Sequence, residues 1–238
     1  MSKNIHTVVF AVILCCVISV LLTAASTGLQ RFQEKNVILD RQKNILKSVG
    51  LMAEDRMYAP EAIEKLYQRS IQAVWADPSG KIIERPTSGE QDVPVYLYTS
   101  DDTIEAYVIP INSRGLWGRI MGYLAIKRDG STISGFTVYK HSETPGLGGE
   151  IEKNWFQKNF VGKKIVDQEG NFVSISIAKG KISDRIPKNQ QIHYVDGISG
   201  ATLTGKYLTA GVKQILESYE PVSIRFRKNL IKKLPGGG

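Results

Sequence analysis

Residues 196–205 read Asp-Gly-Ile-Ser-Gly-Ala-Thr-Leu-Thr-Gly, a run of small and hydroxyl-bearing residues with no charge after Asp196. From Lys206 to Tyr219 apolar residues recur at spacings of three and four, which predicts a helix with one apolar face. We expect the rest of the chain to be organised around this stretch and the helix after it. The apolar face contains Leu208, Val212, Ile215, Leu216 and Tyr219.

The junction between this stretch and the helix has two interpretations. Small residues before a helix allow close approach to the backbone, and the first N–H groups of the helix then favour an anion such as phosphate. In the other interpretation, Ser199 or Thr202 caps the helix by accepting a hydrogen bond from its first turn, and the glycines form the bend. Spacing alone favours the cap, because such caps occur at most helix starts.

The same letters resemble the acceptor motif of bacterial flavin transferases, Asp-x-x-Ser/Thr-Gly-Ala-Thr. Every fixed position of that motif is present from Asp196 to Thr202. In proteins that carry the motif, FMN is joined through its phosphate to the hydroxyl of the final Thr. The resemblance therefore implies a covalent flavoprotein with Thr202 as the acceptor.

The composition is typical of a folded protein, and the distribution of charge does not indicate nucleic-acid binding. The 238 residues are 42% hydrophobic and 23% charged, enough for one sizeable core or for one domain with an anchor. The net charge is +8, but Lys and Arg are scattered and form no basic stripe with aromatics, so we expect no nucleic-acid partner. A basic C-terminal tail, residues 221–238, either contacts an anionic surface or a partner subunit, or is a solvated, frayed terminus. Its basic residues include Arg225, Arg227, Lys228, Lys232 and Lys233.

The N-terminal region is apolar over a membrane-spanning length. No charged residue occurs from Thr7 to Gln30, and about 20 apolar residues suffice to cross a bilayer as a helix. A cleaved signal peptide would fit the small residues Thr23 to Ala25, but the apolar run is longer than a signal peptide needs. We therefore expect residues 1–30 to be a retained single-pass helix in the lipid bilayer of the inner membrane. Its N-terminus would be cytoplasmic, with the bulk of the chain on the periplasmic side.

Both cysteines lie in this apolar segment. Cys15 and Cys16 are adjacent, and we interpret them as small apolar residues that face lipid or a neighbouring helix. The remainder of the chain therefore forms no disulfide and holds no cysteine-ligated iron–sulfur cluster of its own.

The remaining pattern predicts an α+β fold, with one exported domain that has a mixed, mainly antiparallel sheet and flanking helices. A polar helix continues from Gln30 to Leu51, and a short one begins at Pro60, with Ile63, Leu66, Tyr67 and Ile71 on one face. Residues 31–90 are thus expected to be a juxtamembrane helical region, and residues 91–220 the main domain. That domain is predicted to contain strands at 95–98, 104–109, 120–127, 133–139 and 172–178. Asp129-Gly130 is expected to form a hairpin turn. A helix is expected at 151–160, with Trp155 and Phe156 in the core.

Two further stretches lie in predicted loops. Residues 141–150 read His-Ser-Glu-Thr-Pro-Gly-Leu-Gly-Gly-Glu, and their Pro and glycines break both helix and strand. His141 with Glu143 lacks the further ligands that a metal site needs, so the alternatives are a polar turn or a loop that binds a flavin ring through Glu, Thr and Gly. Residues 115–118 read Gly-Leu-Trp-Gly, where Trp117 either enters the core or stacks on a planar ring.

Together the three stretches resemble the C-subunit family of the sodium-translocating NADH:quinone reductase. G-L-W, E-T-P-G-L-G-G-E and S-G-A-T-L-T occur in that family in this order and at comparable separations, and the resemblance covers nearly the whole chain. There are two departures, because Gly118 and Gly205 stand where the family has Ser. Neither departure affects the acceptor Thr, although Gly205 weakens the start of the helix.

The resemblance implies an electron-carrying subunit, with no complete activity expected from this chain alone. The flavin would receive electrons from an iron–sulfur centre of the complex and deliver them to an FMN on its largest membrane subunit. That complex couples NADH oxidation and quinone reduction to Na⁺ export. A flavin transferase using FAD and a divalent metal would attach the FMN, so the metal belongs to that enzyme and none is expected here. Consistently, the chain has no G-x-G-x-x-G fingerprint for NADH.

The implied site has two parts. Ser199, Gly200, Ala201, Leu203 and Thr204 would surround the phosphate and ribityl chain, and Leu116, Trp117, Glu143, Thr144 and Leu147 would surround the ring. Lys179 follows the strand predicted at 172–178, and it either stabilises the charge of a reduced flavin or is a solvated strand-end lysine.

Three alternatives remain open at this level. The nearest is the homologous G subunit of the Rnf-type ferredoxin:NAD oxidoreductase, which shares the acceptor motif and topology. The others are a membrane-anchored exported binding domain with no redox role, and a flavin-binding sensor domain. The continuation Leu203-Thr204, the long juxtamembrane helix and the 143–150 sequence favour the quinone reductase over the Rnf-type complex.

Overall fold

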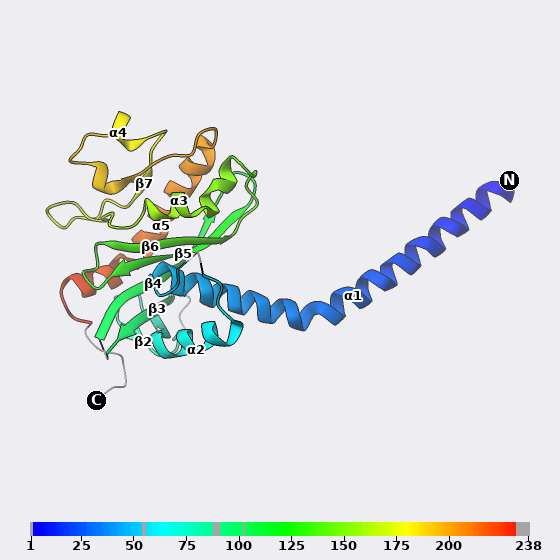
Figure 1. Ribbon diagram of the computed structural model, residues 1–238, viewed down its shortest axis with the longest axis horizontal. Helices are drawn as coiled ribbons and strands as arrows, with labels where there is room; N and C mark the ends of the chain where they lie inside the picture. Colours follow the sequence, from blue (N-terminus) through cyan, green and yellow to red (C-terminus); the bar gives the residue numbers. More distant parts are fainter. Residues whose placement is uncertain (1, 54–55, 88–90, 102, 232–238) are drawn as a thin grey trace. The chain divides into compact units, whose positions relative to one another are not determined.

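The structure is a computed structural model that describes residues 2–53, 56–87, 91–101 and 103–231 (Figure 1). Contacts divide the chain into two units, Met1–Asp40 and Arg41–Gly238. Helix α1 runs without a break from Ser2 to Ser48 and therefore continues from the first unit into the second. This confirms the predicted helical continuation beyond Gln30. The α1 segment Ile5–Gln30 has a mean hydropathy of 3.0, and none of it is buried, so it is long and apolar enough to span a membrane.

The second unit is built on an antiparallel sheet in the order β2-β1-β3-β4-β5-β6. From β3 to β6 each strand pairs with the next along the chain, as the hairpin signal at Asp129-Gly130 predicts for β5 and β6. The fold class predicted from the sequence is therefore confirmed. The bounds are β1 Ile71–Ala76, β2 Ile82–Ile83, β3 Val93–Ser100, β4 Thr103–Arg114, β5 Arg119–Lys127 and β6 Ile133–Lys140.

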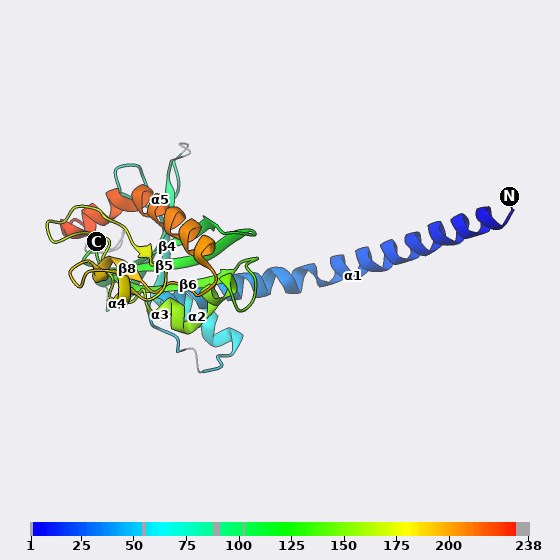
Figure 2. The same ribbon diagram turned by 90° about the horizontal axis from the view of Figure 1, so that it is seen from above.

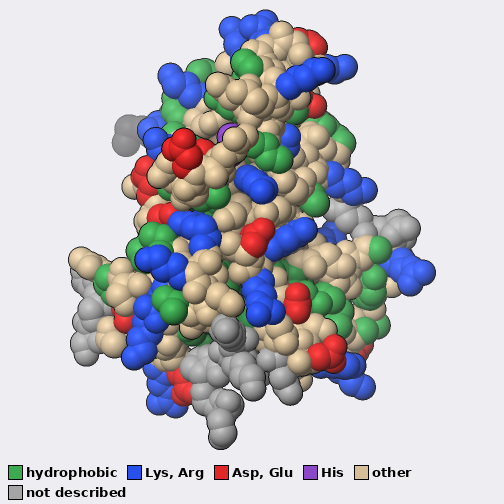
Figure 3. Space-filling model, turned by 90° about the vertical axis from the view of Figure 1, so that its left-hand side faces the viewer, with side chains coloured by type: hydrophobic (Ala, Val, Ile, Leu, Met, Phe, Trp, Pro, Cys, Tyr) green, Lys and Arg blue, Asp and Glu red, His purple; other side chains and the backbone are tan. Residues whose placement is uncertain are grey.

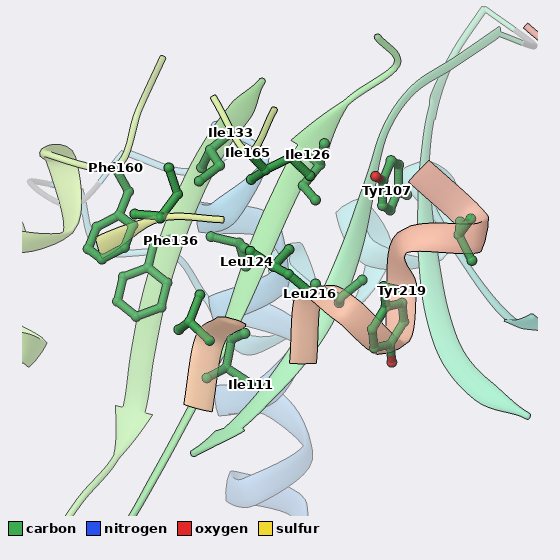
Figure 4. Packing of buried hydrophobic residues seen from close by; sticks show 14 of the residues in the cluster. Tyr107, Ile111, Leu124, Ile126, Ile133, Phe136, Phe160, Ile165, Leu216 and Tyr219 are labelled. Carbon is green, nitrogen blue, oxygen red and sulfur yellow. The ribbon is translucent and has the colours of Figure 1, made fainter. Parts of the chain in front are cut away.

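Helix α5, Thr202–Arg227, covers one face of this sheet (orange to red in Figure 2). Its apolar face packs into the core, where Leu216 and Tyr219 lie beside β5 and β4 (Figure 4). At the far end of the helix, Phe226 stacks on Tyr107 of β4 with ring centroids 4.4 Å apart. The helix is longer at both ends than the predicted span Lys206–Tyr219. At its C-terminal end, buried Val222 and Phe226 extend the apolar face.

The opposite face of the sheet carries the last turns of α1 and helix α2, Pro60–Ser70. Successive residues of a strand point to opposite faces, so Phe136 of β6 enters the core while the Thr137 hydroxyl donates to the Asn44 carbonyl at 3.3 Å. Ile45 and Leu46 of α1 are buried here, at 2% and 0% exposure. The last turns of α1 are thus part of the folded domain.

The predicted helix at 151–160 is two short helices. A 3-10 helix, η1, spans Gly148–Glu152 and α3 spans Asn154–Lys158, because Lys153 between them is extended at φ −79°, ψ 143°. Phe156 is buried as expected and meets the ring of Phe160 edge to face. Phe160 in turn stacks on Phe136 (Figure 4). The expectation that Trp155 is a core residue is wrong, since it is 46% exposed.

The predicted strand at 172–178 is also mostly wrong. Only Ser176–Ile177 form a strand, β7, which pairs in parallel with β8, Tyr194–Val195. Ser174 adopts φ +69°, and the N–H groups of Val173 and Ser174 both donate to the Ile165 carbonyl, so the chain kinks before the strand. Between β7 and β8 lie helix α4, Ile182–Arg185, and the 3-10 helix η2, Gln191–His193.

Strand β1 was missed in the sequence. Ile71 was assigned to the apolar face of the helix that begins at Pro60, but α2 ends at Ser70 and Ile71 begins a strand between β2 and β3. In this strand Ile71, Val74 and Ala76 are buried. The helical spacing continues unchanged into β1, so the pattern gives no sign of the switch.

The C-terminal tail is partly folded. Residues 221–227 continue α5, where Val222 and Phe226 are buried and Arg227 donates to the Gly130 carbonyl at 2.9 Å and pairs with Glu220. The expectation of a solvated or frayed tail is therefore wrong over these residues, while Lys232 and Lys233 lie outside the described residues. On the face shown in Figure 3, Lys and Arg side chains are interspersed with acidic ones.

Candidate functional site

Thr202 is the first residue of α5 and is exposed. The residue at the N-cap is Ala201, and no side chain makes a cap hydrogen bond, so the interpretation of Ser199 or Thr202 as a cap is wrong. The first helical bond of this turn runs from the Gly205 N–H to the Ala201 carbonyl at 3.1 Å. The N–H groups of residues 202–204 therefore precede the helical ladder, as they do in helices that bind anions.

A pocket of about 370 Å³ opens beside Thr202. Two cations line it, Lys179 after β7 and Lys206 on α5. Lys206 lies four residues after Thr202, on the same side of the helix, and this spacing was the sequence signal that would have identified it. The positive end of the helix and two lysines favour an anion here. The lining includes Ile177, Lys179, Gly197, Ala201, Thr202 and Lys206.

Trp117 lies in a tight turn between β4 and β5, closed by a hydrogen bond from the Gly115 N–H to the Gly118 carbonyl at 2.7 Å. Its side chain is 70% exposed and that of Leu116 is 39% exposed, which excludes the core interpretation of Trp117. The turn lines a second pocket of about 360 Å³. An exposed indole held on a short turn is available to contact a planar ligand.

Glu143 joins the three stretches. The residue is 4% exposed, and its Oε1 accepts the Trp117 N–H at 3.0 Å while its Oε2 accepts the Thr204 hydroxyl at 2.5 Å. The 115–118 turn, the 141–150 loop and the first turn of α5 therefore meet at one carboxylate. Both of its oxygens already bind the protein, so its observed contacts are structural ones.

His141 supports Glu143 from the other side. The Glu143 N–H donates to His141 Nδ1 at 3.1 Å, which leaves the ring proton on Nε2, 3.2 Å from Glu152 Oε2. Hydrogen bonds from Lys153 and then His141 hold the pKa of Glu152 below its usual value. Both ring nitrogens of His141 are thus engaged within the protein. Over the described ranges, no group of three or more His, Cys, Asp or Glu side chains is placed to hold a metal ion.

The 141–150 loop folds on itself next to the acceptor stretch. The Thr144 carbonyl accepts the N–H groups of Leu147 and Gly149 at 3.1 and 2.9 Å, while the Thr144 side chain is exposed. The side chain of Leu147, 43% exposed, reaches Gly200, where an added Cβ would lie 2.8 Å from Leu147 Cδ2. Gly200 has φ +74°, a conformation that favours glycine.

The predicted phosphate-side residues differ in their exposure. Ser199, Gly200 and Leu203 are exposed, Ala201 is 6% exposed and Thr204 is 1% exposed. Thr204 lies under the surface with its hydroxyl bound to Glu143, so Thr202 is the accessible hydroxyl of this turn. Leu203 also adds to a set of exposed apolar side chains drawn from all three stretches, namely Leu116, Trp117, Leu147 and Leu203.

These residues fit FMN. A phosphate suits the uncapped helix start beside Lys179 and Lys206, and a flat apolar ring suits the exposed side chains of Trp117, Leu116 and Leu147. Sequence reasoning missed Lys206 and the His141–Glu152 pair.

Comparisons with known proteins identify the domain that contains these residues. The model of the FMN-binding domain family matches residues 115–217, which include all three stretches. A relative in Neisseria meningitidis serogroup A, named as the C subunit of the Na⁺-translocating NADH-quinone reductase, is 36% identical over 224 residues, covering 84% of this chain and 83% of the relative. A protein of the same name in Pseudomonas aeruginosa is 31% identical over 235 residues, covering 86% of this chain and 88% of the relative.

Solved structures show the same fold. The crystal structure of the C subunit of the Na⁺-translocating NADH-quinone reductase from Parabacteroides distasonis superimposes with a TM-score of 0.68 at 29% identity, over 82% of this chain and 96% of that one. The crystal structure of Shewanella oneidensis NqrC, at 23% identity and a TM-score of 0.58, shares the fold over 80% of this chain and 97% of that one.

Proposed function

The chain belongs to the C-subunit family of the Na⁺-translocating NADH-quinone reductase, and on this basis we propose that it carries electrons within such a complex through FMN joined by a phosphoester to Thr202. The other membrane subunits of the reductase are its partners. A flavin transferase attaches the FMN. The chain alone supplies neither the NADH site nor the quinone site.

The observation that supports this proposal most strongly is the position of Thr202. It is the exposed first residue of an uncapped helix, in a pocket with Lys179 and Lys206. Thr204, in the same turn, is buried and donates its hydroxyl to Glu143. The first turn of α5 thus offers one free threonine hydroxyl at a place suited to a phosphate.

The protein's own residues bind and shield the cofactor. The N–H groups at the start of α5 and the ammonium groups of Lys206 and Lys179 balance the phosphate charge, and Lys179 also counters the charge of a reduced ring. When bound, FMN accepts and donates electrons one at a time. Leu116, Trp117, Leu147 and Leu203 give apolar cover that keeps water from the ring, with Ser199, Gly200, Ala201 and Thr144 around them.

The apolar helix supports a location at a membrane. We assign α1 over Ile5–Gln30 to the lipid bilayer of the inner membrane, with the N-terminus cytoplasmic and Arg41–Gly238 on the periplasmic side. Mass spectrometry of the subunits that co-purify with the tagged chain tests the assignment to a complex. Quinone-reductase subunits are expected, and ferredoxin-linked subunits of an Rnf-type complex would contradict it.

The attachment itself is tested by intact-protein mass. The full chain is expressed with and without a flavin transferase, and the modified peptide is mapped. An FMN-sized increase on the peptide that contains Thr202, lost in Thr202→Ala, is expected. An unchanged mass in the presence of an active transferase would contradict the proposal and leave a membrane-anchored binding domain without a redox role.

A further inference from the structure

We propose that Glu143 is a positioning residue that locks the Trp117 turn and the 143–149 loop to the first turn of α5. It thereby fixes the ring-side contacts relative to the attachment hydroxyl of Thr202. This inference rests on the proposed function, because the distance it sets matters only if a flavin is tethered at Thr202. Glu143 acts through Trp117 and Thr204 and need not touch the flavin.

The first argument is the use of both carboxylate oxygens. Oε1 accepts the backbone N–H of Trp117 at 3.0 Å, and Oε2 accepts the Thr204 hydroxyl at 2.5 Å. Trp117 belongs to the turn between β4 and β5, and Thr204 belongs to α5, so the carboxylate joins two elements that are not neighbours in sequence. At 4% exposure these bonds face little competition from water and are stronger than surface ones.

The second argument is that two glycines, Gly115 and Gly148, leave just enough space for the Glu143 carboxylate. A Cβ added at Gly115 would lie 2.5 Å from Glu143 Oε1, and one added at Gly148 would lie 2.7 Å from Oε2 and 2.6 Å from the Thr204 hydroxyl oxygen. These are far closer than real contacts of a Cβ atom. Both neighbouring segments are therefore glycine where they pass the carboxylate, and the carboxylate has little room to move away from its two partners.

The third argument is the support of the Glu143 backbone. His141 Nδ1 accepts the Glu143 N–H, and Nε2 of the same ring lies 3.2 Å from Glu152 Oε2. The side chain of His141 is 14% exposed and that of Glu152 is 47% exposed, so the bond to the Glu143 N–H is partly buried while the bond to Glu152 faces water. The start of the loop is thus held from η1 while the Glu143 side chain holds the turn and α5. Such support of a ligand-binding loop sets the geometry of a site without contact with the ligand.

Three substitutions, each at a different residue, disrupt the contact between Glu143 and Thr204. Glu143→Gln keeps size but removes the negative charge and turns one acceptor into a donor. Thr204→Val removes the donor on α5, and Gly148→Ala forces a methyl group between the two side chains. Glu217→Gln, at an exposed residue of α5, is the control. Each full-length chain is purified in detergent, and amide exchange of the Trp117 peptide is measured by mass spectrometry before flavin is added. Flavin attachment by the transferase is then timed, and the visible circular dichroism of the product is recorded.

Thr204→Val is the decisive variant because it lies on a different element from Trp117. We expect it to speed exchange at Trp117 about tenfold and to slow flavin attachment by a similar factor, the effect of losing one buried charge-assisted hydrogen bond. Glu143→Gln and Gly148→Ala should do the same, and all three should alter the dichroism of the attached flavin. The double variant Glu143→Gln/Thr204→Val should be no slower than the slower single variant.

Three results would overturn the inference. Wild-type exchange at Trp117 in Thr204→Val would show that no link runs through Glu143. Wild-type attachment and dichroism in all three variants would show that the link does not position the flavin. Additive losses in the double variant would show that Glu143 and Thr204 act separately. If the wild-type chain accepts no flavin at all, the proposed function falls, and the inference falls with it.

Discussion

At the scale of single residues, the identity of the acceptor is the sharpest prediction. Thr202→Ser keeps the hydroxyl and is expected to accept flavin, while Thr202→Val removes it and is expected to accept none. Thr202 is exposed and makes no cap bond, so both variants should unfold within about 0.5 kcal/mol of wild type, as surface substitutions usually do. Intact mass and chemical denaturation measure the two effects. Flavin on Thr202→Val would assign the attachment to another residue.

Gly200 offers a second residue-scale prediction with a matched control. Gly200 and Gly146 both have φ +74°, but a Cβ at Gly200 would meet Leu147 Cδ2 at 2.8 Å, whereas at Gly146 nothing lies within 4 Å. Each change to Ala carries the strain of a left-handed conformation, about 1–2 kcal/mol. Only Gly200→Ala also displaces Leu147, so it should slow flavin attachment several-fold more than Gly146→Ala at similar stability. Equal attachment rates would show that Leu147 does not shape the site.

The site could be predicted from the sequence only in part, and the reason lies in its residues. The letters of the three stretches single them out by resemblance to a known family, and the structure brings the three together at Glu143. The role of Thr202 as acceptor stays a prediction. The roles of Glu143 and His141 depend on hydrogen bonds to Trp117, Thr204 and Glu152, which lie up to 61 positions away along the chain. No local pattern encodes such contacts.

At the scale of elements, substitutions in the two parts of α1 are expected to affect the stability of the domain differently. Leu46 is fully buried in the domain, whereas Ile38, on the same helix, is 57% exposed. Leu46→Ala should lower the free energy of unfolding by about 2–5 kcal/mol, because it empties a packed site. Ile38→Ala should change it by no more than about 0.5 kcal/mol. Thermal denaturation of the detergent-solubilised protein compares them, and equal midpoints would show that the last turns of α1 are not part of the folded core.

The elements that the sequence predicts well are strands whose apolar runs end at turn residues. The four strands β3 to β6 follow alternating or continuous apolar runs that are too short for a helix and are bounded by turn residues. The prediction of a strand at 172–178 is mostly wrong because Ser174 takes a left-handed backbone conformation, which a serine gives no reason to expect. Strand β1 is not predicted because Ile63 and Ile71 keep the same helical spacing although a helix–strand boundary lies between them.

At the scale of the whole molecule, buried tyrosines determine the response to alkali. Burial raises the pKa of Tyr67 to about 12 and raises the pKa values of Tyr96, Tyr107, Tyr123 and Tyr219 above their usual range. The folded state therefore keeps protons that the unfolded state releases, and stability falls as pH rises. The tyrosine contribution should be complete below about pH 10, the ordinary tyrosine pKa. It should be lost as pH rises through the folded-state values, about 12 for Tyr67.

Two measurements check this alkaline behaviour. Urea denaturation at a series of pH values should give a constant tyrosine contribution up to about pH 10 and a decline above it. Ultraviolet absorbance of tyrosinate should rise in two stages, with the second accompanying loss of structure. Complete ionisation of all tyrosines near pH 10 with the fold intact would contradict the predicted burial effect.

The order of elements along the chain also determines at what stage of folding the site can form. Helix α5 comes last among the described elements, yet it supplies Leu208, Val212, Leu216 and Phe226 to the core of strands made long before it. Because a chain is synthesised from its N-terminus, this face of the sheet stays uncovered until α5 has been made. Thr202, at the start of α5, therefore reaches its place beside the sheet only when α5 packs against it. If flavin is attached at Thr202 as proposed, chains that stop before α5 packs on the sheet are expected to carry none.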